Sequence, residues 1–172
     1  NGTRVQDFLK KYILKPSAIL NVETAKSSSP TAWAPGFHII GYSAKTHPDT
    51  LHWFLTNHET FEDPDVAKKL IEHPNTSEET LTSPVFNYHI ESDPDPVQYH
   101  ISIARNRNIP NDILATYLQS DHKYLRGSAL SNPTLPESEF NNPVNLQSMH
   151  YLRSLVQNPS MPRSFQKNIF HN

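Results

Sequence analysis

The sequence predicts an all-α fold, an α-solenoid of about six two-helix repeats. Three observations lead to this prediction: a recurring phrase that contains proline, apolar positions at fixed distances from it, and a low hydrophobic content. The chain has 172 residues, of which 35% are hydrophobic, with 15 prolines and 4 glycines. This length suits one domain or two small ones. We expect a single helical-repeat domain over residues 1–172, with a thin core distributed along the repeats.

The recurring phrase is a short apolar segment that ends in Asn-Pro and is followed by a second proline. Residues 129–136 read ALSNPTLP, residues 155–162 read LVQNPSMP, and residues 103–110 read IARNRNIP. Weaker copies lie upstream, and the spacings between anchor residues run from 26 to 33. The anchors are Lys15, His47, His73, Asn106, Asn132 and Asn158.

Each anchor predicts the two helices of its repeat. Apolar residues stand seven and three positions before the anchors, and this spacing of four defines one face of a short helix. The following proline ends that helix. A further apolar residue, seven or eight positions after the anchor, predicts a second short helix, headed by Pro110, Pro136 or Pro162 in three repeats. Because one such unit cannot bury its apolar face alone, the repeats must stack.

Acidic residues precede the first helix of several repeats. Asp63 and Asp65, Asp93 and Asp95, and Asp121 all stand within about two turns of its apolar residues. Aspartate at this place caps a helix and favours its positive end. A calcium loop is the alternative interpretation, but the required glycine and distal glutamate do not follow. We therefore predict helix caps.

The segment 121–136 resembles the leucine-rich repeat variant family. It has Asp121 ahead of a Leu-Arg pair at 125–126, then Ala-Leu at 129–130 and Asn-Pro at 132–133. The resemblance covers most of the chain and is strongest over about 95–165. It implies α-helices that alternate with short 3-10 helices in a right-handed superhelix, and only a general binding role. The repeats here are longer than is usual in the family, and several have His-Pro or Asn-Arg in place of Asn-Pro.

Composition argues against an enzyme. The chain has no cysteine, which excludes disulfides, thiolate metal sites, a cysteine nucleophile and the iron–sulfur cluster of a founding family member. No Gly-rich phosphate loop, nucleophile elbow or His-Glu-x-x-His motif occurs. His47 and His73 occupy equivalent positions, but packed helices lie about 8–10 Å apart, too far for two side chains to share a metal at about 2.0–2.1 Å. We predict a non-enzymatic protein without cofactor or metal.

We interpret the anchor histidines and asparagines as caps of helix ends, since both residue types tolerate the left-handed backbone. The two longest spacings hold insertions at residues 27–37 and 85–92. Insertions in solenoids form loops on one face, often the binding face. The aromatic residues that would contact a partner there are Trp33, Phe37, Phe86 and Tyr88. In the alternative interpretation these rings pack back against the repeats.

Charge is unevenly distributed along the chain. Residues 1–97 hold 8 basic and 13 acidic residues, and residues 98–172 hold 7 basic and 4 acidic residues. Five basic residues lie around the first helices of successive repeats and could line one surface, typical of nucleic-acid binding. They are Arg105, Arg107, Lys123, Arg126 and Arg153. A solvated face is the alternative, and head-to-tail contact between molecules is a further one.

The sequence therefore predicts a protein- or peptide-binding scaffold, with Arg105 and Arg126 added to the aromatic contact residues. The alternative is a nucleic-acid-associated protein with a DNA-binding surface in its C-terminal half, similar in architecture to the HEAT-like DNA-repair glycosylases. No signal-peptide or membrane-helix pattern occurs, and we expect a cytoplasmic protein without a membrane partner. Because the chain begins with Asn1 rather than Met, we expect either a processed chain or a piece of a longer protein. The oligomeric state stays open.

Overall fold

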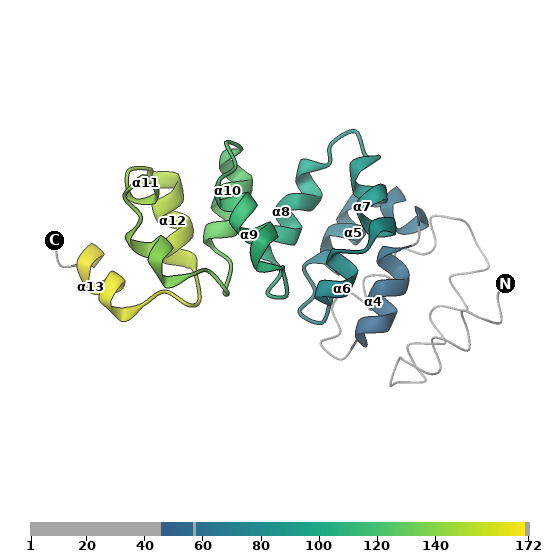
Figure 1. Ribbon diagram of the computed structural model, residues 1–172, viewed down its shortest axis with the longest axis horizontal. Helices are drawn as coiled ribbons and strands as arrows, with labels where there is room; N and C mark the ends of the chain where they lie inside the picture. The colour runs from purple at the N-terminus through teal and green to yellow at the C-terminus, as the bar shows by residue number, and fades with distance from the viewer. Residues whose placement is uncertain (1–45, 57, 171–172) are drawn as a thin grey trace. The chain divides into compact units, whose positions relative to one another are not determined.

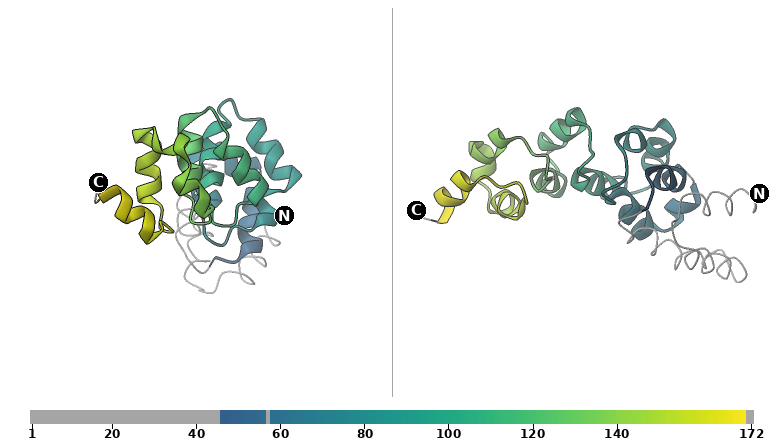
Figure 2. Two further views of the ribbon diagram at one scale, coloured as in Figure 1. Left: turned by 60° about the vertical axis from the view of Figure 1, so that its left-hand side comes forward. Right: turned by 90° about the horizontal axis from the view of Figure 1, so that it is seen from below.

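A computed structural model describes residues 46–56 and 58–170 of the chain. Over these residues the protein is all-helical, with ten α-helices, two 3-10 helices and no strand (Figure 1). This confirms the predicted all-α class for the described part. The chain divides into two compact units, Asn1–Tyr99 and His100–Asn172, named unit 1 and unit 2 below. Figure 2 shows from two further sides that each is made of short helices joined by turns.

Unit 1 packs four short α-helices around one core. They are α4 (Pro48–Leu55), α5 (Pro64–Ile71), α6 (Glu78–Leu81) and α7 (Pro84–Glu91), with the 3-10 helix η2 (His58–Glu62) between α4 and α5. Helix α4 contacts α5, α6 and η2, and α6 contacts α7. Proline is the first residue of α4, α5 and α7, where its fixed φ suits the helix and its missing N–H is not needed.

Helix α8 (Val97–Arg105) begins in unit 1 and continues into unit 2. Unit 2 further holds α9 (Asn111–Leu118), α10 (Lys123–Leu130), α11 (Pro143–Leu146), α12 (Met149–Gln157), α13 (Arg163–Phe170) and the 3-10 helix η3 (Glu137–Asn141). Helix α10 contacts α9 and α12, while α11 contacts η3 and α12. Short α-helices and 3-10 turns thus follow one another, as expected for two-helix repeats.

The predicted apolar positions form the core of both units. In the first helices, the described residues seven and three positions before the anchors are buried, with one exception, Tyr151, which is half-buried. In the second helices, all described members of the apolar column are buried. These second-helix members are Leu55, Leu81, Leu114, Phe140 and Phe165. The burial expected for these apolar positions is therefore found over the described residues.

The second insertion is a helix, so the predicted loop over residues 85–92 is wrong. Pro84 opens α7, and Phe86 and Ile90 stand four residues apart on its inner face. Phe86 has no exposed surface, and its ring lies 6.2 Å from that of Phe61. The alternative interpretation, in which the aromatic ring packs against the repeats instead of contacting a partner, is confirmed for Phe86. The first insertion, with Trp33 and Phe37, lies outside the described residues.

Helix capping follows the prediction only in part. The Oδ1 atom of Asp63 accepts hydrogen bonds from two backbone N–H groups at the start of α5, at 3.1 and 3.2 Å. Asp93 instead closes a turn, accepting the N–H of Asp95 and the hydroxyl of Tyr99 at 2.8 and 3.0 Å. The cap of α10 is not Asp121 but the next residue, described below.

Candidate protein-binding surface

Buried asparagine side chains join successive repeats of unit 2. The Nδ2 group of Asn132 donates to the carbonyls of Ala104 and Asn106 at 2.6 and 2.9 Å. Asn158 repeats this pattern one repeat later, donating to the carbonyls of Leu130 and Asn132 at 2.8 and 2.7 Å. Both asparagines are buried, and each bonds carbonyls at the end of the preceding first helix. These bonds align the ends of α8, α10 and α12 at a fixed register.

Histidine takes the anchor position in the described repeats of unit 1. Through Nδ1, His47 and His73 accept the backbone N–H two residues later, at 3.3 and 3.0 Å. The Oδ1 atom of Asn132 accepts the equivalent N–H at 2.8 Å. His47 and Asn158 are helix caps, as predicted, whereas His73 closes the turn between α5 and α6. The predicted left-handed backbone is wrong, because no described non-glycine residue has a positive φ. The backbone at His47 and Asn158 is extended rather than left-handed.

The aligned repeats bring a chain of four rings together where α10 and α12 begin. Tyr124 and His150 hold equivalent positions in successive repeats, and their ring centroids lie 5.5 Å apart, edge to face. On either side, His122 lies 5.9 Å from Tyr124 and Tyr151 lies 5.7 Å from His150. Edge-to-face contacts at these distances are favourable for aromatic rings. We name the surface formed by His122, Lys123, Tyr124, Met149, His150 and Tyr151 the tyrosine–histidine surface.

Much of this surface faces solvent. Tyr124 is 53% exposed and Met149 is 68% exposed, which is unusual for large apolar side chains. His122 and Lys123 are exposed as well, and His150 and Tyr151 are half-buried. The Nζ atom of Lys123 lies 4.7 Å above the centre of the Tyr124 ring, in a cation–π contact. The surface therefore combines rigid rings, one flexible thioether and a positive charge.

Hydrogen bonds fix which nitrogens of the two histidines face outward. His122 caps α10, because its Nδ1 accepts the N–H of Leu125 at 3.3 Å, so its Nε2 carries the proton. His150 places Nε2 at 3.1 Å from the carbonyl of Lys123. Since a carbonyl only accepts, the Nε2 of His150 donates, and its Nδ1 is left available. One histidine thus presents a donor to solvent, and the other presents an acceptor when neutral.

Gly127 allows α12 to approach α10 at this place. A Cβ atom on Gly127 would lie 2.8 Å from the Nε2 of His150 and 3.2 Å from the Oγ of Ser154. A larger residue would therefore push the imidazole away from the carbonyl of Lys123. Glycine in the middle of a helix destabilises the helix by about 1 kcal/mol relative to alanine. At position 127 this cost is offset by the close packing of α12 on α10.

Below the surface, Arg126 occupies a polar layer between α10, α11 and η3. Its guanidinium donates to the Oδ1 of Asn145 at 2.8 Å and lies 4.9 Å from the centre of the Tyr151 ring. The Nδ2 of Asn145 in turn donates to a carboxylate oxygen of Glu139 at 2.8 Å. The Nε of Arg126 is buried and has no hydrogen-bond partner. Arg126, predicted as a partner contact, therefore supports the surface from beneath.

No family model matches the chain, and no curated protein or solved structure has significant similarity to it. In the described part of the chain, no group of three or more His, Asp or Glu side chains could hold a metal ion. Nor does any described helix have the length and apolar character needed to cross a membrane.

The other predicted contact residues do not join this surface. Tyr88 is 69% exposed on α7 of unit 1, beside the exposed Val85. Phe86 is buried in the core of the same unit, so it offers no contact to a partner without unfolding of α7. Arg105 is exposed at the last residue of α8. Trp33 and Phe37 lie outside the described residues.

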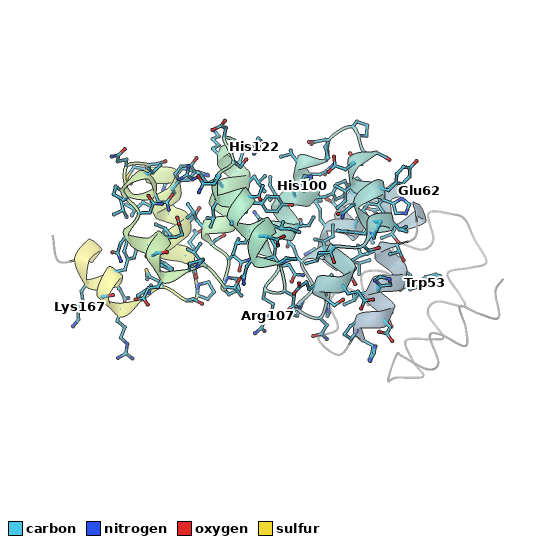
Figure 3. The ribbon with its side chains drawn as sticks, viewed as in Figure 1. Trp53, Glu62, His100, Arg107, His122 and Lys167 are labelled. Carbon is cyan, nitrogen blue, oxygen red and sulfur yellow. The ribbon has the colours of Figure 1, made fainter. Side chains whose placement is uncertain are left out.

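The predicted basic surface is not assembled as one stripe. Because Asn132 joins the C-terminal ends of α8 and α10, Arg105 lies beside the end of α10. Lys123 begins α10, and a helix of 8 residues is about 12 Å long. Figure 3 likewise shows Arg107 and His122 at opposite ends of the helices of unit 2. Arg105 and Arg107 therefore lie at the opposite end of the helices from Lys123.

Sequence reasoning missed His122, Tyr124, Met149 and His150. The available signal was the repeat register itself, because Tyr124 and His150 both stand eight residues before their anchors. Adjacent repeats with rings at the same exposed position place those rings in contact. Long spacings between anchors indicate loops, but they carry no information about rings at equivalent exposed positions of adjacent repeats.

Proposed function

We propose that this protein is a non-enzymatic scaffold that binds a protein or peptide segment on the tyrosine–histidine surface of unit 2. The observation that carries the proposal is the chain of four rings across α10 and α12, half of it open to solvent. Tyrosine supplies a large contact area at little cost in conformational entropy, and an exposed Met adapts to different apolar partners. Both features are typical of peptide-binding surfaces.

The scaffold itself is proposed to be an α-solenoid over residues 1–172, a right-handed superhelix similar to leucine-rich repeat variant proteins. The asparagine bonds between successive repeats of unit 2 support this, because each repeat contacts the carbonyls of the one before it at the same offset. Repeats that contact only their neighbours build extended binding surfaces. Rings at equivalent positions then recur along such a surface with a regular spacing, which suits an extended peptide.

The matched pair of exposed tyrosines tests the proposal. The full chain would be used to select binders from a random peptide display library, and the affinity of a selected peptide would be measured by isothermal titration calorimetry. We expect Tyr124→Ala to weaken binding by more than about 1 kcal/mol, as removal of a buried interface tyrosine does. Tyr88→Ala, which removes an even more exposed ring from unit 1, is expected to leave the affinity unchanged.

Two results would count against this assignment. If selection on the full chain yields no binder, the surface does not bind peptides. If selected peptides bind equally well to the wild type and to Tyr124→Ala, but are lost with Tyr88→Ala, the binding face is α7 of unit 1. Circular dichroism of both variants checks that a lost signal is not a lost fold.

Single-stranded nucleic acid is a second candidate ligand. The specific observation that favours it is that Lys123 and Arg126 each stack on a tyrosine, of α10 and α12 respectively. Bases stack on such rings while cations contact phosphates. This candidate predicts an affinity for a labelled oligonucleotide that falls steeply as salt is raised. A peptide held mainly by its apolar side chains would show only a small salt dependence.

A further inference from the structure

We infer that the tyrosine–histidine surface binds an acidic peptide, one whose carboxylates alternate with aromatic or apolar side chains. This inference rests on the proposed function and names the chemistry of its ligand. It follows from the hydrogen-bonding groups that the surface leaves open, from a positive charge beneath it, and from the positions of the neighbouring carboxylates.

The open polar groups of the surface are mostly donors. Lys123 makes no ion pair within the described residues, so its ammonium is available to a ligand. His122 uses Nδ1 for the helix cap and presents the Nε2 proton outward. The hydroxyl groups of Tyr124 and Tyr151 make no hydrogen bond to described residues, and each can donate one proton. A ligand rich in acceptors matches this set.

A positive charge below the surface adds to this preference. Arg126 has no carboxylate within 4.0 Å among the described residues, and its one side-chain hydrogen bond goes to the neutral amide of Asn145. The buried Nε of the same guanidinium has no partner. An incompletely paired charge of this kind favours an anion nearby. Its ring contact with Tyr151 places the charge directly under the surface.

The nearest carboxylate in the layer beneath is already engaged. Glu139 accepts hydrogen bonds from the amide groups of Asn142 and Asn145 at 3.1 and 2.8 Å. Through Asn145 it contacts Arg126 only indirectly. The exposed carboxylate of Asp121 stands next to His122 in sequence and makes no ion pair to described residues. Neither Lys123 nor Arg126 therefore has a carboxylate of the described residues within 4.0 Å.

The exposed apolar area of the surface favours a peptide ligand over a small anion or a nucleic acid. Tyr124 and Met149 offer exposed apolar area between the charged groups, which suits side chains that alternate with carboxylates. Residues 98–172 hold only 7 basic against 4 acidic residues. Arg105 is the last residue of α8, and Figure 3 shows Arg107 at the opposite end of the helices from His122. A nucleic acid needs a longer row of cations to contact successive phosphates.

The test compares two labelled copolymers that differ only in charge: one of glutamate and tyrosine, and one of glutamine and tyrosine. Fluorescence anisotropy with the full chain measures both affinities at low and moderate salt. We expect the glutamate copolymer to bind about tenfold more tightly or better, with a difference that shrinks as salt is added. A single-stranded oligonucleotide of similar length serves as a third ligand.

Two lysines provide a matched pair of variants. Lys123→Gln removes a charge within the surface, and Lys167→Gln removes one from α13, which Figure 3 shows well away from His122 in unit 2. Both side chains are exposed, so neither substitution threatens the fold. We expect Lys123→Gln to weaken the glutamate copolymer by about two- to fivefold, the scale of an exposed charge pair. Lys167→Gln and the glutamine copolymer report nonspecific effects and should change little.

The possible outcomes separate this inference from the proposed function. Equal binding of both copolymers, lost with Tyr124→Ala, would keep the peptide-binding surface and overturn its preference for acidic ligands. Preferential binding of the oligonucleotide, sensitive to Lys123→Gln, would replace the peptide by a nucleic acid. Binding of the glutamate copolymer that responds equally to both lysine substitutions would overturn the inference as well, because only overall charge would matter. If none of these ligands binds, and library selection also fails, the proposed function fails with it.

Discussion

Replacing Asn132 by alanine should strongly destabilise unit 2. Asn132 is fully buried and makes four hydrogen bonds through its side chain. Two donate to the carbonyls of Ala104 and Asn106, and two accept from Thr134. The substitution removes all four at once, and alanine leaves no group in their place.

The structure sets the size of the effect. A hydrogen bond contributes about 0.5–1.5 kcal/mol net, and a buried group left without its partner costs about 1–3 kcal/mol. The residues that carry the two carbonyls, Ala104 and Asn106, are buried in the native state, whereas Thr134 is exposed and can bind water instead. Counting each carbonyl at about 1–3 kcal/mol and each Thr134 bond at about 0.5 kcal/mol gives about 3–7 kcal/mol. Asn132→Asp keeps the two acceptor bonds but turns an oxygen toward both carbonyls, so it should also be destabilising.

Urea unfolding followed by far-UV circular dichroism measures the change, and Asn87→Ala is the control. Asn87 lies exposed on α7, and its substitution should alter stability by no more than about 0.5 kcal/mol. Hydrogen exchange should accelerate at the ends of α8 and α10 in Asn132→Ala, because those carbonyls lose their link. A loss below about 1 kcal/mol for Asn132→Ala would refute the reasoning, since the asparagine bonds would then not hold the repeats together.

Three further changes test the core, a cap and a buried hydroxyl. Phe140→Ala should cost about 3–5 kcal/mol in urea unfolding because the ring is buried, whereas truncation of the exposed Val144 should cost little. His122→Ala should cost about 1 kcal/mol through the lost cap of α10, and His122→Asn, which restores a cap acceptor, should recover most of it. Burial, together with the hydrogen bond to Asp93, raises the pKa of Tyr99. The neutral Tyr99 hydroxyl should therefore stabilise the fold fully below the pKa of an unfolded tyrosine, about 10. This stabilisation should be lost as the pH rises further. In Tyr99→Phe the free energy of unfolding should decline less over the same pH range.

The repeat register could be predicted from the sequence because proline and apolar spacing act locally. Residues seven and three positions before the anchors, such as Leu125 and Ala129, are buried as expected. The exception, Tyr151, has a cause that lies outside its own repeat. The guanidinium of Arg126, from the repeat before, stacks on its ring and holds it at the boundary with solvent. The sequence pattern within one repeat does not predict such contacts between side chains of neighbouring repeats.

The contrast between local patterns and contacts made in the folded protein also explains why the predicted loop at Phe86 is wrong. The sequence had the signals of a helix there, with Pro84 at its first position and Ile90 one turn beyond Phe86. The long spacing between anchors suggested a loop, but an insertion of seven residues is also long enough for two turns of helix. Burying Phe86 and Ile90 against the unit 1 core decides between the two. A pattern of two apolar residues four apart should have outweighed the rule about insertions.

The separation of structural and binding positions follows from the repeat itself. Where the repeats of unit 2 agree, as at Asn132 and Asn158, the side chain reaches the previous repeat and is buried, so any change there disturbs stacking. Eight positions earlier the repeats differ, with Tyr124 in one and His150 in the next, and the side chains meet at the surface. Beyond the fit of the two rings, stacking involves only the hydrogen bond from His150 to the carbonyl of Lys123 and the close approach of His150 to Gly127. Specificity for a ligand can therefore be encoded at those positions without loss of stability, which is why the binding surface is expected there rather than at the anchors.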